Sequence, residues 1–192
     1  AEMRAAIDYY QRAIQISPNM AHLYNQTAWA YYLLGDYQQA RVFFNRSLEL
    51  DSSYPDTYRL LSALNRSQGQ PQKALTMLER SGELYLALND LESAASVYKD
   101  ALGIDPNLLS AHSALGFIYY RQGLLQEAID ENLHILALAP NDPMAQRNLT
   151  LLYREPDRKG GPEDEASTTP QPNESEQRPL LKAFLAGLSK VR

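Results

Sequence analysis

The sequence contains no cysteine, and this absence removes several kinds of chemistry at once. Without thiols there are no disulfides, no thiolate metal ligands and no cysteine nucleophile. The three histidines, His22, His112 and His134, match no metal-binding spacing. A glycine-rich phosphate loop and a serine in a nucleophile-elbow context are also missing. We therefore expect no catalytic residues, no metal and no cofactor.

The chain also lacks an excess of positive charge and any long apolar run. Its formal net charge is -5, whereas binding to phosphate backbones requires a basic face, so we expect no nucleic-acid partner. No apolar stretch approaches the length of a membrane span, and the given residues are expected to be soluble.

What the sequence does have is a ladder of alanines. They recur at steps of 34, 34, 20 and 34 residues, and they are Ala6, Ala40, Ala74, Ala94 and Ala128. A period of 34 residues is the length of one helix-turn-helix repeat, and small residues recur where two helices approach closely. The ladder therefore predicts stacked helical hairpins.

Residues around the alanines carry a second pattern. Near Ala40 they are Tyr24, Ala28, Tyr31, Gly35 and Phe44, and near Ala128 they are Leu115, Gly116, Tyr119, Gly123 and Pro140. This pattern resembles the tetratricopeptide repeat family over about 150 residues, with departures at Ser47, Ser62, Asn65 and Asn132. The resemblance implies an all-α, right-handed solenoid of helical hairpins.

Local signals place the helix boundaries independently. Gly35, Gly69, Gly123 and Asn89 can take the left-handed conformation that ends a helix, and Asn19, Asn107 and Asp142 can cap the following helices. We expect no strand and about nine helices, at 2–16, 20–34, 37–50, 55–68, 71–88, 90–104, 108–122, 125–138 and 143–153.

The step of 20 residues between Ala74 and Ala94 predicts an irregularity in the stacking near 71–90. In one interpretation, the helix over 71–88 completes one repeat with its first half and opens the next with Gly82 and Tyr85. The superhelix would then change direction there. In the other, the first helix of one pair has been deleted.

We divide the chain into three parts. Residues 1–153 form the repeat array, which begins in the middle of a repeat and suggests that an upstream segment was removed. Residues 154–179 have the composition of a disordered linker, and 180–192 read as a short amphipathic helix. Its apolar face consists of Leu180, Leu181, Phe184, Leu185, Leu188 and Val191. This helix could dock in the groove of the array, bind another protein or lie on a membrane surface, or it could be an incidental end.

The family resemblance implies a concave surface lined by the first helix of each repeat. The candidate groove residues are His22, Asn25, Trp29, Tyr32, Arg59, Ala63, Arg66, Ser113, Phe117, Tyr120 and Arg121. Aromatic and arginine side chains suit an extended peptide with apolar and acidic or carboxamide groups. Alternatively, several of them, Trp29 and Phe117 in particular, could only pack between helices. The asparagine-lysine clamp of chaperone-binding relatives is not expected, because Trp29 and Ala63 replace its small polar groups.

Two functional hypotheses follow. The chain is a non-catalytic scaffold or assembly factor that binds a partner protein or peptide in its groove. Alternatively, it is the repeat region of a larger membrane-anchored transferase, ligase or secretion component whose chemistry lies upstream.

Overall fold

The computed structural model describes residues 2–154, and these residues form nine α-helices with no strand among them. Their bounds are α1 (Glu2–Ile16), α2 (Ala21–Leu33), α3 (Tyr37–Leu50), α4 (Pro55–Ser67), α5 (Pro71–Ala87), α6 (Leu91–Leu102), α7 (Leu109–Arg121), α8 (Leu125–Leu138) and α9 (Pro143–Arg154). The linker beyond α9 and the helix predicted over 180–192 lie outside the described residues and stay predictions. No described helix is long and apolar enough to cross a membrane.

The helix ends confirm most of the local predictions. Gly35, Gly69, Gly123 and Asn89 all have positive φ, and the φ of 58° at Asn89 shows asparagine in the left-handed position that glycine takes elsewhere. Asp142 caps α9 by accepting hydrogen bonds from the backbone N–H groups of Met144 and Ala145. The predicted caps at Asn19 and Asn107 are wrong, because α2 and α7 start one residue later, after Met20 and Leu108, and lack a side-chain cap.

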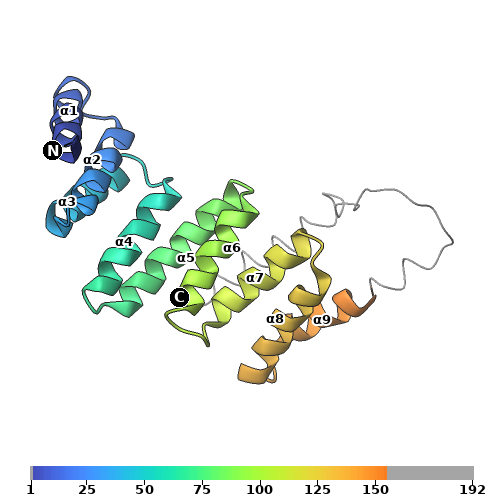
Figure 1. Ribbon diagram of the computed structural model, residues 1–192. Helices are drawn as coiled ribbons and strands as arrows, with labels where there is room; N and C mark the ends of the chain where they lie inside the picture. Colours follow the sequence, from blue (N-terminus) through green and yellow to red (C-terminus); the bar gives the residue numbers. More distant parts are fainter. Residues whose placement is uncertain (1, 155–192) are drawn as a thin grey trace. The chain divides into compact units, whose positions relative to one another are not determined.

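Contacts divide the chain into two compact units, which meet between Val97 and Tyr98. In the first unit, α2 packs against α3 and α4 packs against α5 as antiparallel hairpins (Figure 1). The Ser47 hydroxyl donates to the carbonyl of Ala21 at 2.9 Å, and the Ser81 hydroxyl donates to the carbonyl of Pro55 at 2.8 Å. Donor and acceptor of the second bond each lie 34 residues after those of the first, so each hairpin contains an equivalent hydrogen bond.

The alanine ladder marks close packing, as predicted. Four of its members have no exposed surface, namely Ala40, Ala74, Ala94 and Ala128. Ala6 on α1 is partly exposed. The core of the first unit forms around Ala28, Ala40, Phe44, Leu61 and Leu64, with Tyr31, Tyr32, Phe43, Leu48, Leu60 and Met77 packed against it. Phe44 is fully buried and is the largest side chain of this group.

Helix α5 is continuous across the irregular step, and two of its side chains bond to α4. Ser81 bonds to Pro55 in the middle of α5, and Tyr85 near its end donates to the carboxylate of Asp56. No break separates the half that contains Ala74 from the half that contains Tyr85. The predicted change of direction concerns parts of the chain whose relative position is not defined, and it stays a prediction.

In the second unit, α7 packs against α8 and α8 against α9. Asn132 occupies the place where the family pattern has an aromatic residue, and it is buried. Its amide donates to the carbonyl of Ala128 at 2.7 Å and its oxygen accepts from the amide of Asn148 at 3.0 Å. The second of these bonds joins α8 to α9 beside a small apolar core of Ala128, Ile129, Leu149 and Leu152.

Candidate functional site

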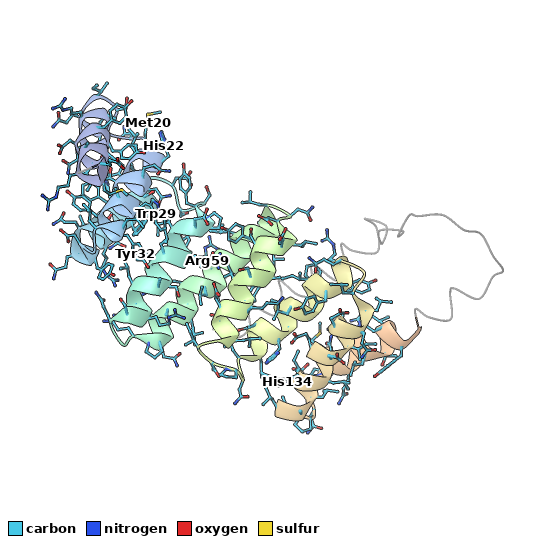
Figure 2. The ribbon with its side chains drawn as sticks, viewed as in Figure 1. Met20, His22, Trp29, Tyr32, Arg59 and His134 are labelled. Carbon is cyan, nitrogen blue, oxygen red and sulfur yellow. The ribbon has the colours of Figure 1, made fainter. Side chains whose placement is uncertain are left out.

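An exposed group of aromatic rings lies on α2 and at the start of α3. Trp29 is 39% exposed, and its indole stacks on the ring of Tyr32 with centroids 5.6 Å apart and planes within 6° of parallel. The Tyr32 ring in turn contacts Tyr37 at 5.5 Å. We call Trp29, Tyr32 and Tyr37 the aromatic face. Figure 2 shows His22, Trp29 and Tyr32 in succession along one side of α2.

The aromatic face is attached to the core of the first unit through Tyr32. Tyr32 packs against the buried core of the first unit, so its ring supports Trp29 from a fixed position. Met20 and Leu33, 48% and 50% exposed, add apolar surface at the two ends of α2. A rigid exposed aromatic surface costs little side-chain entropy when it is covered by a ligand, because the rings are already ordered.

Asn25 has a structural role in addition to its predicted place in the groove. Its side-chain oxygen accepts a hydrogen bond of 2.9 Å from the hydroxyl of Thr57, which is fully buried on α4. The bond fixes α2 against α4 near the start of both helices. His22, one turn earlier, is exposed.

Helix α4 carries a polar cluster that joins it to α5 and α6. Arg59 donates to the hydroxyl of Ser96 on α6 at 3.1 Å, while Asp56 accepts from the hydroxyl of Tyr85 on α5. Burial raises the pKa of Tyr85 above its usual value, and the hydrogen bond to Asp56 raises it further. Arg59 itself is half-buried within this cluster.

Arg66 differs from Arg59 although both lie on the same side of α4. It is exposed, and it forms no ion pair or side-chain hydrogen bond with the described residues. Its charge is therefore available to a ligand. The half-buried Ala63 lies between the two arginines, one turn from each.

The groove candidates on α7 belong to the second unit. The guanidinium of Arg121 lies over the ring of Phe117 at 5.7 Å, which fits a cation–π contact. Tyr120 packs against the small apolar core beside α8, and Ser113 is half-buried. The structure thus brings Phe117 and Arg121 together, whereas Tyr120 contributes to packing.

Two of the three histidines, which match no metal-binding spacing in the sequence, come together in this unit. The rings of His112 and His134 lie 4.1 Å apart, and Nδ1 of His112 lies 2.6 Å from the carboxylate of Glu131. Its Nε2 lies 2.9 Å from the carbonyl oxygen of Pro106. His112 is buried and joins α7 to α8 and to the preceding turn. Within residues 2–154, no group of three or more metal-ligating side chains is placed to hold an ion.

Sequence reasoning missed Tyr37, Asp56 and Ser96. A signal was available for Asp56, because it lies 34 residues after His22 and so occupies the same repeat position. Tyr37 and Ser96 had no such signal, since their roles depend on which rings and helices meet in space.

Two profiles of known families match the chain. One, described as tetratricopeptide repeat, covers residues 21–54, and the other, described as TPR repeat, covers residues 82–123. The chain carries tetratricopeptide repeats. The first match coincides with the hairpin of α2 and α3, and the second begins at Gly82, inside α5. A repeat that begins within a continuous helix favours the interpretation in which α5 is shared between two repeats.

Curated relatives are similar over most of this chain. A TPR repeat-containing protein from Methanocaldococcus jannaschii is 25% identical over 191 residues, covering 88% of this chain and 33% of that protein. A BBSome complex member from Bos taurus is 23% identical, covering 73% of this chain and 30% of that protein. A human protein O-mannosyl-transferase is 24% identical, covering 78% of this chain and 19% of that protein. The chain thus spans a third or less of these relatives.

Solved structures show weaker similarity. The crystal structure of YrrB, a TPR protein with an unusual peptide-binding site, has a TM-score of 0.40 and 19% identity, covering 79% of this chain and 85% of that one. The crystal structure of MamA has a TM-score of 0.40 and 18% identity, covering 81% and 91%. The repeats themselves support a role in binding proteins or peptides.

Proposed function

We propose that this protein is a non-catalytic interaction scaffold or assembly factor, and that its first unit binds a peptide segment of a partner protein along α2 and α4. The observation that carries this proposal is the exposed, internally stacked aromatic face. Binding energy at protein interfaces concentrates in a few aromatic and arginine side chains, and this surface offers both types. Arg66 supplies the charged group and Trp29 the apolar anchor.

Substitution of Trp29 provides the test. Partners would be captured on the immobilised chain and quantified by mass spectrometry for wild type, Trp29→Ala and a control, Tyr9→Ala. Tyr9 on α1 is 71% exposed, so its removal takes away a comparable exposed ring elsewhere. We expect Trp29→Ala to lose partners that Tyr9→Ala retains. Retention of all partners by a folded Trp29→Ala chain would contradict the proposal.

Further contacts are proposed for the second unit and for the end of the chain. Ser113, Phe117, Tyr120 and Arg121 would add a second contact region. Residues 180–192 would dock on the array through Leu180, Leu181, Phe184, Leu185 and Leu188. Amide exchange of the described helices with and without these residues tests the docking, and unchanged protection would count against it.

A second function is proposed on the name of one relative, the human protein O-mannosyl-transferase. In this alternative, the repeats belong to a larger membrane-anchored protein with chemistry outside these residues. The gene around this sequence discriminates the two: several hydrophobic spans upstream of residue 1 favour the alternative, and their absence favours the scaffold.

A further inference from the structure

We propose that the first unit recognises an acidic, proline-containing peptide in extended conformation, with a proline on the aromatic face and a carboxylate on Arg66 about three residues away. This inference rests on the function proposed above and specifies the chemistry of the ligand.

The aromatic face determines the apolar part of the ligand. Trp29 and Tyr32 lie nearly parallel, and Tyr37 is tilted by 52° against Tyr32, so that each ring contacts the next. Aromatic surfaces of this kind bind proline rings well, because proline is flat, apolar and already restricted to extended conformations. Its missing N–H also leaves no donor unsatisfied on an apolar surface.

The charges around this surface determine the polar part. Eight residues occupy the groove positions of α2 and α4: His22, Asn25, Trp29, Tyr32, Asp56, Arg59, Ala63 and Arg66. Two are arginines and one is an acid, and that acid already accepts from Tyr85. This surface is therefore positive on a chain whose net charge is -5. Arg66, which has no partner among the described side chains, is the natural site for a carboxylate.

The hydrogen bonds fix the direction and register of α2 and α4. Asn25 meets Thr57 near the start of both helices. Arg41 at the start of α3 bonds to Asn65 and Gln68 at the end of α4. Because α3 runs antiparallel to both neighbours, α2 and α4 run in the same direction.

The spacing of the two ligand groups follows from this register. With about 1.5 Å of rise per residue, Tyr32 lies about 10 Å beyond Asn25, and Arg66 about 13 Å beyond Thr57. The two side chains thus start at nearly the same level of adjacent helices. The Asn25–Thr57 bond keeps the two helices within side-chain reach of each other, and an extended chain of three residues covers about 10 Å.

The proposal can be tested with the full chain and no label, because Trp29 is its sole tryptophan. The probe is a capped eight-residue peptide of serine and alanine with proline at its third position and glutamate at its sixth. Its addition should change the emission of Trp29 in a saturable way. Peptides with alanine or leucine instead of the proline, or glutamine instead of the glutamate, should bind at least threefold more weakly.

Charge reversal on the protein supplies the matched control. Arg66→Glu should weaken binding of the glutamate peptide about fivefold and improve binding of the same peptide with lysine at its sixth position, as expected for an exposed ion pair. Arg12→Glu, at an exposed arginine on α1, should change neither affinity. Added salt should reduce the difference in affinity for the glutamate peptide between wild type and Arg66→Glu.

Several results would overturn the proposal. One is an unchanged Trp29 emission up to millimolar peptide, and another is equal binding of the peptides with and without proline. Tighter binding of the lysine peptide than of the glutamate peptide to wild type would also contradict it. So would an emission change on dilution of the protein alone, which would indicate that a second copy of the chain covers this surface. If these occur while Trp29→Ala still loses captured partners, the ligand chemistry is wrong but the scaffold function stands.

Discussion

The indole of Trp29 lies flat against the ring of Tyr32, which itself packs on the core of the first unit. Tyr32→Ala should therefore expose the single tryptophan further without unfolding the chain. We expect its emission maximum to shift to longer wavelength while the helical circular dichroism is retained. An unchanged emission spectrum would show that the two rings do not stack in solution.

Asn25 and His22 should behave differently although both are predicted groove residues of α2. Asn25→Ala leaves the buried hydroxyl of Thr57 without its partner and should lower the free energy of unfolding by about 1–2 kcal/mol. His22→Ala removes an exposed side chain and should change it by less than about 0.5 kcal/mol. Urea unfolding measures both, and equal effects would contradict the structural role of Asn25.

Tyr85 should make stability depend on pH in the alkaline range. Its pKa is higher in the folded protein than the value of about 10 in the unfolded chain. Its contribution to the free energy of unfolding is therefore complete below a pH of about 10 and is lost as the pH rises through the folded-state pKa. Tyr85→Phe should cost about 1–2 kcal/mol at neutral pH through the lost bond to Asp56. The difference in the free energy of unfolding between wild type and Tyr85→Phe should become smaller above a pH of about 10. A difference that stays constant with pH would contradict the raised pKa of Tyr85.

Gly116 lies where α7 approaches α8 closely. A Cβ there would meet the amide nitrogen of Asn132 at 3.1 Å, and that amide is held by Ala128 and Asn148. Gly116→Ala should gain about 1 kcal/mol of helix propensity but lose about 2 kcal/mol through the forced contact, for a net loss of about 1 kcal/mol. Adding Asn132→Ala should make the Gly116→Ala change favourable. Additive effects of the two substitutions would exclude this contact.

Phe44 is fully buried at the centre of the first unit. Phe44→Ala should lower the free energy of unfolding by about 3–5 kcal/mol, because the surrounding helices cannot close the cavity completely. Thermal and urea unfolding would measure the loss. An effect of about 1 kcal/mol or less would show that this core is loosely packed.

Much of the fold was predictable because its determinants are local. Gly35, Gly69, Gly123 and Asn89 end helices through a backbone conformation that few residues adopt. The alanine ladder predicted where helices meet, because a small side chain lets two helices approach closely, and four of the five alanines have no exposed surface. Capping was less predictable: Asn19 and Asn107 are suitable residues, but the helices start one position later.

The candidate site was predictable in part. The period of 34 residues places Trp29, Ala63, Tyr32 and Arg66 at equivalent repeat positions, so their common surface follows from sequence. The sequence could not show that Arg59 bonds to Ser96 whereas Arg66 remains exposed, because this depends on how α4 and α6 pack in space.

The sequence by itself determined the helices, their order and the repeat, since these depend on periodicity, small residues and turn residues along the chain. The tertiary structure alone decided which side chains meet. The rings of His112 and His134, 22 positions apart in the sequence, lie 4.1 Å apart because α7 and α8 fold back on each other. Trp29 remains exposed because Tyr32 fills the space beneath it. Such contacts depend on distances between helices, which no local pattern records.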